Sequence, residues 1–235
     1  MLTVHHLQRS QSERIVWLCE ELGIDYDLKL YPRRADNGLA PDELKRLHPA
    51  GTAPVIVDGP VVLAESQAVV EYIVNKYGKD RATNKPRLTV TLEDGDEAYA
   101  DYLYWLNFAN GTLQCSISRN MNFKRVEDLV PADHMVRVFV RSKLEGGLDQ
   151  LEARLRKTGA YLAGQELTIA DIMTVFSLST MRGLYPLDLS KWSAVLEYLQ
   201  RIGQRKAYQD AMAKGDPGLT PMLGANVESI ALGKK

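Results

Sequence analysis

The segment 51–66, which reads GTAPVIVDGPVVLAES, constrains the fold of this chain more than any other stretch. Two β-branched runs, at 55–57 and 61–63, are joined by Asp58-Gly59, a dipeptide typical of two-residue turns. This pattern predicts an antiparallel β-hairpin. The N-terminal part of the chain is therefore expected to be organised around this hairpin.

Each end of the hairpin offers groups to a ligand. Pro54 restricts Ala53 to extended geometry. If the bond between them is cis, the backbone N–H and C=O of Ala53 are expected to point outward, unpaired, where an extended peptide could pair with them. Ser66 is expected to be the N-cap of a helix over 66–77, where its hydroxyl and the first helical N–H groups suit a carboxylate. Glu65 beside it suits an ammonium group. A peptide-like ligand with an α-carboxylate and an α-amine fits this pattern, although an ordinary capped helix after a hairpin produces it too.

The residue-Pro-Val strand entrance, followed by a Glu-Ser helix start, resembles the glutathione-binding half of cytosolic glutathione transferases. The resemblance covers nearly the whole chain and is to the serine-type, theta-like enzymes of fungi and bacteria. It implies an α/β thioredoxin-like domain over 1–78, a linker over 79–91, an all-helical domain over 92–214 that contributes the electrophile pocket, and an irregular tail over 215–235.

The pattern of the first 78 residues agrees with a thioredoxin-like order of elements. A strand is predicted over 2–7, and an amphipathic helix that follows it is expected to stop at Gly23. A second strand over 26–30 and a short helix over 42–47 then lead to the hairpin.

Two serines lie between the first strand and the first helix, where a thioredoxin-type fold places its chemistry. Ser12 lies two residues before Arg14, as an N-cap would, which leaves Ser10 free to face a ligand. In the serine-type transferases the catalytic serine lies four residues ahead of the arginine that opens the helix, and Ser10 stands in that relation to Arg14. Ser10 is therefore the first choice for the catalytic residue and Ser12 the second.

Donating a hydrogen bond to a thiolate is the role expected of this serine. Neither His5 nor His6 has an evident triad partner, so covalent catalysis is discounted. Lowering the pKa of a thiol from ~8.5 to ~6.5 takes ~2.7 kcal/mol. One hydrogen bond to a charged sulfur contributes ~1.5–3 kcal/mol and a helix N-terminus ~0.3–1 kcal/mol, so the two suffice without a metal or organic cofactor.

The rest of the chain is almost wholly helical in pattern. An apolar stripe marks a long helix, and the resemblance assigns three of its residues to an electrophile pocket: Leu106, Asn110 and Leu113. A second long helix after Pro131 carries an apolar set: Met135, Phe139, Leu144, Leu148, Leu151 and Leu155. Thr168 and Asp171 form a capping box, which makes Asp171 structural, and a further helix is predicted over 193–213.

Composition narrows the function classes. A formal net charge of −1 without a Lys/Arg cluster argues against nucleic-acid binding. No apolar run approaches the ~20 residues that span a bilayer, and no signal-peptide pattern opens the chain, so a cytoplasmic protein that does not act at a membrane is expected. Cys19 and Cys115 form no C-x-x-C, and the four histidines show no metal-ligand spacing.

The resemblance implies how glutathione, the co-substrate, would lie. Its γ-glutamyl end would contact Glu65 and Ser66, and its backbone would follow Ala53. The glycyl carboxylate would lie near Thr52 and His48. The thiolate would attack a small apolar electrophile, and the protein would be a homodimer.

Two alternatives stay open: a glutathione-dependent disulfide reductase or peroxidase on the same scaffold, and a non-catalytic transferase-like binding or regulatory protein.

Overall fold

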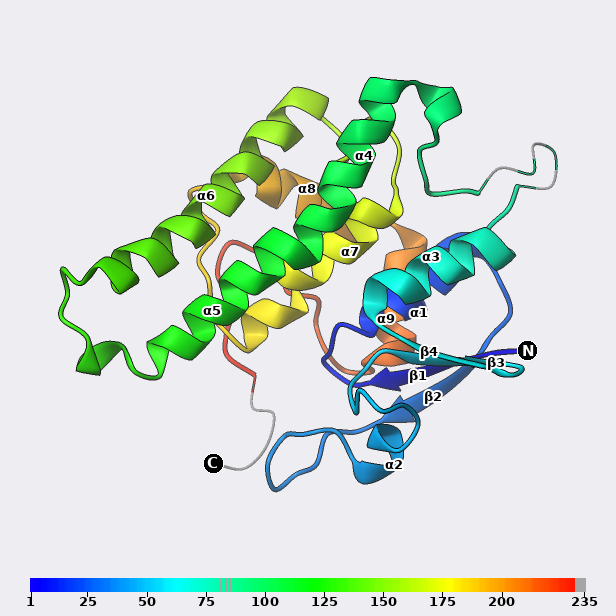
Figure 1. The fold of residues 1–235 in the computed structure, drawn as a ribbon, viewed down its shortest axis with the longest axis horizontal. Coiled ribbons are helices and arrows are strands. Elements are labelled where there is room, and N and C mark those ends of the chain that lie inside the picture. Colours follow the sequence, from blue (N-terminus) through cyan, green and yellow to red (C-terminus); the bar gives the residue numbers. More distant parts are fainter. Residues whose placement is uncertain (81, 83, 85, 231–235) are drawn as a thin grey trace.

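The N-terminal part of the chain is a four-stranded sheet with the strand order β2-β1-β3-β4 (Figure 1). In this computed structural model the described residues are 1–80, 82, 84 and 86–230. β1 (Leu2–Leu7) and β2 (Asp27–Tyr31) run parallel and are connected through α1 (Glu13–Leu22). β3 (Val55–Asp58) is antiparallel to both β1 and β4 (Val61–Ala64). This order of elements confirms the predicted thioredoxin-like fold.

Helices lie on both sides of this sheet. α1 and α3 (Ser66–Tyr77) lie on one side and α2 (Asp42–Lys45) on the other (Figure 1). Gly23 ends α1 in the left-handed conformation, and its N–H bonds to the carbonyls of Cys19 and Glu20, as the sequence predicts. The sheet is therefore the layer between α1 and α3 on one side and α2 on the other (Figure 1).

The hairpin turn lies one residue later than predicted. Asp58 pairs with Val61 across the strands, so Gly59 and Pro60 form the turn in place of Asp58-Gly59. The Asp58 carboxylate accepts hydrogen bonds from the hydroxyl of Tyr72 at 2.8 Å and of Tyr77 at 2.7 Å. These bonds to α3 hold Asp58 in the strand, which a local turn signal does not reveal.

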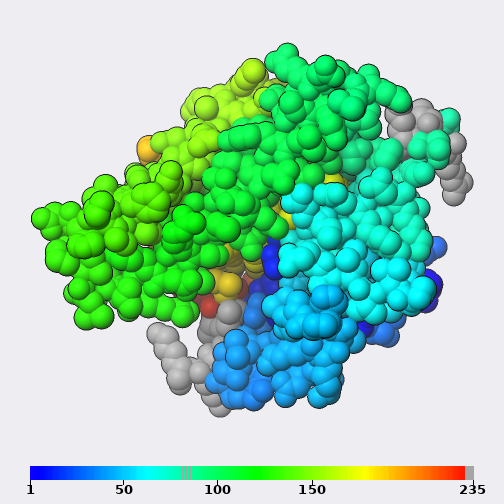
Figure 2. Space-filling model, viewed as in Figure 1, coloured from blue at the N-terminus to red at the C-terminus, as the bar shows by residue number. Residues whose placement is uncertain are grey.

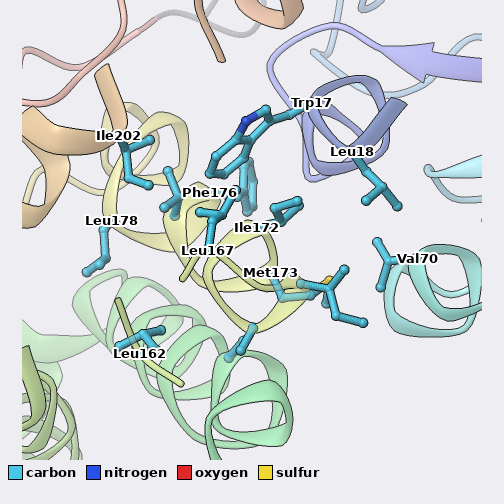
Figure 3. Close-up of a cluster of buried hydrophobic side chains, with 14 of the residues drawn as sticks. Trp17, Leu18, Val70, Leu162, Leu167, Ile172, Met173, Phe176, Leu178 and Ile202 are labelled. Atoms are coloured by element: carbon cyan, nitrogen blue, oxygen red, sulfur yellow. The ribbon is translucent and has the colours of Figure 1, made fainter. Parts of the chain in front are cut away.

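The remaining elements are helical, as predicted. They are η1 (Leu92–Asp94), α4 (Asp96–Phe108), the π-helix η2 (Ala109–Gln114), α5 (Cys115–Lys124), η3 (Glu127–Leu129), α6 (Met135–Thr158), α7 (Ile169–Leu178), η4 (Thr180–Gly183), α8 (Ser193–Gly203) and α9 (Lys206–Gly215). Every residue of α7 is buried. Figure 3 shows Trp17 of α1, Val70 of α3 and Ile202 of α8 around it. One continuous apolar core thus joins the helices to the α1 and α3 side of the sheet.

The start of α7 has the predicted capping box. The Thr168 N–H and hydroxyl donate to one Asp171 carboxylate oxygen at 2.9 and 3.1 Å. The other oxygen accepts from the Leu162 N–H at 2.9 Å and the Tyr198 hydroxyl at 3.0 Å. Asp171 is fully buried, and this burial raises its pKa. Its contacts are all within the protein, which agrees with a structural role.

The helix predicted over 193–213 is two helices. Arg205, which has an extended backbone, separates α8 from α9. Its guanidinium binds the Glu21 carboxylate through two hydrogen bonds of 2.6 and 2.7 Å. The break lets α9 pack on α1, where the rings of Trp17 and Tyr208 meet edge to face at 5.1 Å.

The apolar face predicted for α6 is not buried over the first turns of this helix. Met135 is 78% exposed and Phe139 51% exposed, whereas Leu144, Leu148, Leu151 and Leu155 are buried. Figure 1 shows that α5 and α6 extend together beyond the other helices at this end. No packed layer covers the first turns of α6 among the described residues, so the periodic pattern continues past the core.

The boundaries at 78, 91 and 214 stay predictions. Part of the predicted linker (81, 83 and 85) and of the predicted tail (231–235) lies outside the described residues. Residues 216–230 contain no helix or strand. Within the ranges that the structure describes, no helix is both long and apolar enough to cross a membrane.

Candidate active site

A cavity of about 360 Å³ lies between the sheet domain and the helices. The space-filling view shows a hollow between the blue and green surfaces (Figure 2). The lining from the N-terminal part includes Ser10, Gln11, Arg33, Lys45, Thr52 and Ala53, and that from the helical part includes Gln114, Met121, Phe176, Met181 and Leu184. Leu7, Leu39 and Ala40 also line the N-terminal side. The polar groups of the cavity therefore lie mainly on that side, and the helical side is apolar except for Gln114.

Ser10 reaches this cavity from the loop before α1. Its carbonyl accepts the Glu13 N–H at 3.1 Å, and its hydroxyl accepts the Ser12 N–H at 3.2 Å. Ser12 is fully buried and is not among the residues that line the cavity. Ser12 lies at the N-cap position, as predicted, but its side chain makes no capping bond and instead contacts Ser10, Leu7 and His6. Of the two candidate serines, the structure brings Ser10 to the cavity.

The entrance of β3 supplies a second part of the N-terminal lining. The Ala53–Pro54 bond is cis. The Ala53 carbonyl is not unpaired, as the sequence interpretation expects, because it accepts a hydrogen bond of 3.1 Å from the Gln11 amide. Ala53 and the exposed Thr52 line the cavity, whereas the buried Pro54 lies behind them. His48 is outside this lining, and its ring accepts the Ala50 N–H at 3.1 Å.

Ser66 differs from its predicted role as N-cap. Glu65 occupies the N-cap with φ 71° and ψ 111°, and Ser66 is the first helical residue of α3. The Glu65 side chain is exposed. The Ser66 hydroxyl lies 3.3 Å from both the Arg14 guanidinium and the Asn110 amide nitrogen, which explains why it does not cap the helix. A non-glycine residue with positive φ is uncommon and is often found at functional sites.

Five side chains form a polar cluster beside the cavity: Gln11, Arg14, Ser66, Asn110 and Gln114. Arg14 is fully buried, and burial lowers its pKa to about 9. Its guanidinium donates to the amide oxygens of Gln11 at 3.1 Å and Gln114 at 2.8 Å and lies 5.1 Å from the Phe176 ring centre.

The polar cluster has unused hydrogen-bonding capacity. In the described part of the chain, no carboxylate pairs with Arg14 within ion-pair distance, and its Nε has no hydrogen-bond partner. The buried Asn110 amide oxygen also lacks one there. The cluster therefore carries positive charge to the N-terminus of α3, which itself favours anions. The sequence interpretation used Arg14 only as the helix start and did not include Gln11 or Gln114.

Of the three residues predicted for the electrophile pocket, Asn110 lies in the polar cluster. Leu106 and Leu113 lie elsewhere. Leu106 and Leu113 are buried in the main core. Leu106 lines a different cavity, of about 420 Å³, with Tyr99 and Tyr102. Neither lines the cavity at Ser10, whose apolar wall comes from Met121, Phe176, Met181 and Leu184. Periodicity does not distinguish residues of a cavity wall from core residues, so these four could not be identified from the sequence.

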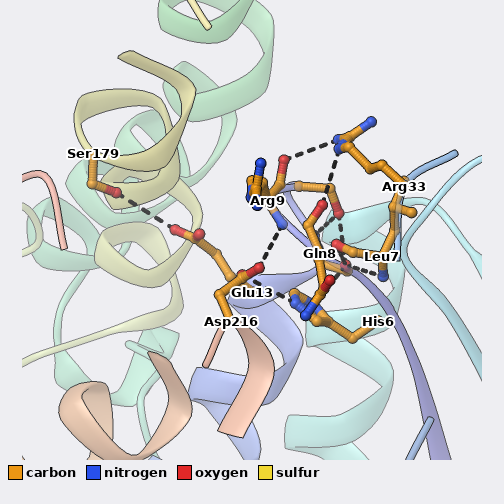
Figure 4. Close-up of polar contacts among 10 residues, drawn as sticks. His6, Leu7, Gln8, Arg9, Glu13, Arg33, Ser179 and Asp216 are labelled. Atoms are coloured by element: carbon orange, nitrogen blue, oxygen red, sulfur yellow. Dashed lines mark hydrogen bonds and ion pairs between the residues drawn. The ribbon is translucent and has the colours of Figure 1, made fainter. Parts of the chain in front are cut away.

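His6 has partners that the sequence interpretation did not find. Its Nδ1 lies 2.8 Å from the Ser12 hydroxyl, and its Nε2 lies 3.2 Å from the Asp216 carboxylate. The expectation that His6 lacks a triad-like partner is wrong, because the chain after α9 returns to β1 and delivers Asp216 (Figure 4). A separation of 210 residues leaves no local signal for this contact.

Both cysteines are free, Cys19 being buried and Cys115 exposed. No group of three or more His, Cys, Asp or Glu side chains within the described ranges is arranged to hold a metal ion.

Comparison with known proteins agrees with this architecture. Residues 9–76 match the model of the glutathione S-transferase N-terminal domain, and residues 96–201 match that of the C-terminal domain. Glutathione S-transferase 3 of Schizosaccharomyces pombe is 30% identical over 91% of this chain and 88% of its own. Glutathione S-transferase 1 of Saccharomyces cerevisiae is 25% identical over 91% of this chain and 95% of its own.

A solved structure also matches nearly the whole fold. The crystal structure of a glutathione S-transferase from Actinobacillus pleuropneumoniae has a TM-score of 0.80 and 31% identity, with 93% of this chain and 94% of that one covered. The sheet domain and the helical domain thus occur together in proteins of one kind. The chain belongs to the glutathione S-transferase family of enzymes.

Proposed function

We propose that this protein binds glutathione, stabilises its thiolate through the Ser10 hydroxyl and conjugates it to small apolar electrophiles. The observation that carries this proposal is the position of Ser10, on the N-terminal side of a cavity whose helical side is apolar except for Gln114. A thiol placed there would meet a hydroxyl donor at the start of α1, and an electrophile would have an apolar surface next to it.

Glutathione would lie along the N-terminal side of the cavity. Its γ-glutamyl ammonium group would contact the exposed Glu65 carboxylate, and its α-carboxylate would lie at Ser66 and the N-terminus of α3. The buried charge of Arg14 behind Ser66 favours an anion at this point. The peptide part would pair with the backbone of Ala53, next to Pro54.

The glycyl carboxylate would reach the Thr52 end of the cavity, near His48. Lys45 and Arg33 also line the cavity and add positive charge. Because the His48 ring already holds the Ala50 N–H, Lys45 is the better partner for this carboxylate.

The electrophile would contact Met121, Phe176, Met181 and Leu184. Met side chains adapt to irregular apolar shapes, which suits a site that accepts several small substrates. Asn110 would belong to the γ-glutamyl end of the site because it contacts Ser66. Leu106 and Leu113, the other two residues predicted for the pocket, would support the helix behind it.

Activity with a panel of substrates tests the reaction type. The purified protein would be given glutathione together with apolar aryl and alkyl halides, with mixed disulfides, or with organic peroxides. We expect the halides to be conjugated at the highest kcat/KM. Faster turnover of disulfides or peroxides would favour a reductase or peroxidase, and the lack of any turnover despite glutathione binding would favour a non-catalytic role.

We also propose that the protein acts in the cytoplasm as a homodimer, with glutathione as co-substrate, in detoxification. The two free cysteines suit a reducing compartment.

The proposed homodimer needs a subunit interface. Exposed apolar side chains on β4, on α4 and on the segment before α4 would suit one: Val62, Leu92, Leu103 and Tyr104. Light scattering coupled to gel filtration should give twice the mass of one chain, and the mass of a single chain would contradict the dimer.

A further inference from the structure

Four buried side chains form a hydrogen-bonded series that begins at the cavity. The Ser10 and Ser12 hydroxyl oxygens are 2.7 Å apart, and the Ser12 oxygen lies 2.8 Å from His6 Nδ1. His6 Nε2 lies 3.2 Å from the Asp216 carboxylate. His6 and Ser12 are 0% exposed and Asp216 is 3% exposed. The series therefore connects the proposed thiol site to a carboxylate in the protein interior.

Further contacts hold the Asp216 end of this series in place. Its second carboxylate oxygen accepts the Arg9 N–H at 2.7 Å, which holds Arg9 at φ 55° directly before Ser10. The chain reaches His6 through Gly215, where a Cβ atom would lie only 3.1 Å from Nε2. A larger residue at 215 would displace the imidazole. The ring, the carboxylate and the loop of Ser10 are thus fixed together.

Asp216 is the charged group in direct contact with the His6 ring, with a carboxylate oxygen 3.2 Å from Nε2. Glu13, at the start of α1, is buried, and burial raises its pKa to about 8, so it is largely uncharged at neutral pH. The Arg33 side chain interacts electrostatically with Asp216, and its guanidinium donates to the carbonyls of Gln8, Arg9 and Gly38. Asp216 is the carboxylate placed to neutralise an imidazolium at His6.

Hydrogen-bonding rules fix the direction of the bonds when His6 is neutral. A carboxylate only accepts, so His6 Nε2–H donates to Asp216 and Nδ1 is left as an acceptor. The Ser12 O–H lies closer to Nδ1, at 2.8 Å, than to its other acceptor, the Leu7 carbonyl, at 3.3 Å, and therefore donates to Nδ1. The Ser12 oxygen then accepts the Ser10 O–H and the Leu7 N–H, at 2.7 and 3.1 Å. In this state the Ser10 hydrogen points into the protein and is not available to a thiolate.

We propose that His6 stores the proton that glutathione loses when its thiol ionises. The thiol hydrogen moves to the Ser10 oxygen, the Ser10 hydrogen moves to Ser12, and the Ser12 hydrogen moves to His6 Nδ1. One S–H and two O–H bonds break while two O–H bonds and one N–H bond form, and no atom is oxidised or reduced. The thiolate receives a hydrogen bond from Ser10, and the imidazolium pairs with Asp216.

This inference rests on the proposed activation of glutathione at Ser10. In the proposed proton transfer, three residues behind Ser10 do not touch the substrate: Ser12, His6 and Asp216. They position Ser10 and hold the proton. If these contacts were purely structural, they would hold the loop in place. The number of protons released on glutathione binding would then not depend on them. The proton count therefore separates the two roles.

The test compares protons released with thiolates formed in the wild-type protein. Calorimetry of glutathione binding in buffers of different ionisation enthalpy gives the protons released, and the ultraviolet absorbance of the bound thiolate gives the thiolates formed. We expect far fewer than one proton released per thiolate at neutral pH. One proton per thiolate would overturn the relay and leave the proposed function intact, whereas no thiolate at all would overturn both.

His6→Asn supplies a variant that accepts from Ser12 but does not take up a proton. We expect it to release one proton per thiolate and to need a higher pH for thiolate formation. His5→Asn is the matched control, since His5 lies on the same strand, is similarly buried and contacts Tyr31 instead of the serines. A His6 variant that matches the wild type in both readouts would contradict the proposal. If that variant does not fold, the wild-type proton count alone decides.

Discussion

Replacing Ser10 by alanine should lower the rate of conjugation most at acidic pH. A hydrogen bond to a charged sulfur stabilises it by ~1.5–3 kcal/mol, which corresponds to ~1–2 pKa units. With an apparent pKa of ~6.5 in the wild type, the thiol of the variant would titrate at ~7.6–8.7. The thiolate fraction at a pH of about 6.5 would then fall roughly 7- to 80-fold, but less than about 2-fold near pH 9.

The assay is kcat/KM for conjugation between about pH 6 and pH 9, together with the glutathione Kd. The Kd should change little, because the γ-glutamyl and glycyl contacts do not involve Ser10. The Ser12 N–H would lose its acceptor at 3.2 Å, so a stability loss of about 1 kcal/mol is expected as well. Ser142→Ala, at an exposed position of α6, serves as control. A loss of activity that is equal at all pH values would refute the thiolate role of Ser10.

Three further changes test other parts of the site and fold. Glu65→Gln should weaken glutathione binding roughly 5- to 30-fold without a change in Tm, since a charged contact is lost from an exposed side chain; an unchanged Kd would exclude the γ-glutamyl assignment. The raised pKa of Glu13 means that the folded protein holds a proton that the unfolded chain releases above about pH 4.5, so its contribution to stability is lost as the pH rises from about 4.5 to about 8. Glu13→Gln should remove this loss, on the order of 4 kcal/mol, in urea unfolding at these two pH values. Asp171→Ala should cost about 3 kcal/mol in the same assay, because the Leu162 and Thr168 N–H groups lose their acceptor, and a cost near zero would contradict the structural role.

Short-range signals account for what could be predicted from the sequence. The hairpin, the extent of α3, the end of α1 at Gly23 and the capping box at Thr168 each depend on residues a few positions apart. The order of these elements then matched a known architecture over nearly the whole chain. The choice of Ser10 came from the resemblance, which implies a catalytic serine four residues ahead of the arginine at the helix start.

Contacts between distant segments account for what could not be predicted. The break between α8 and α9 depends on Glu21, which binds Arg205 from across the core. Ser66 begins α3 without capping it because Arg14 and Asn110 hold its hydroxyl. The cavity wall of Met121, Phe176, Met181 and Leu184 comes from several helical segments, and no single period in the sequence groups these residues.

Glutathione binding with the thiolate absorbance followed in the same sample tests the central claim most directly. We expect saturable binding and a thiolate signal from the bound tripeptide near neutral pH, where the free thiol is almost wholly protonated. Absence of binding at millimolar glutathione, or bound glutathione that stays a thiol up to its ordinary pKa, would contradict the claim that this cavity activates glutathione.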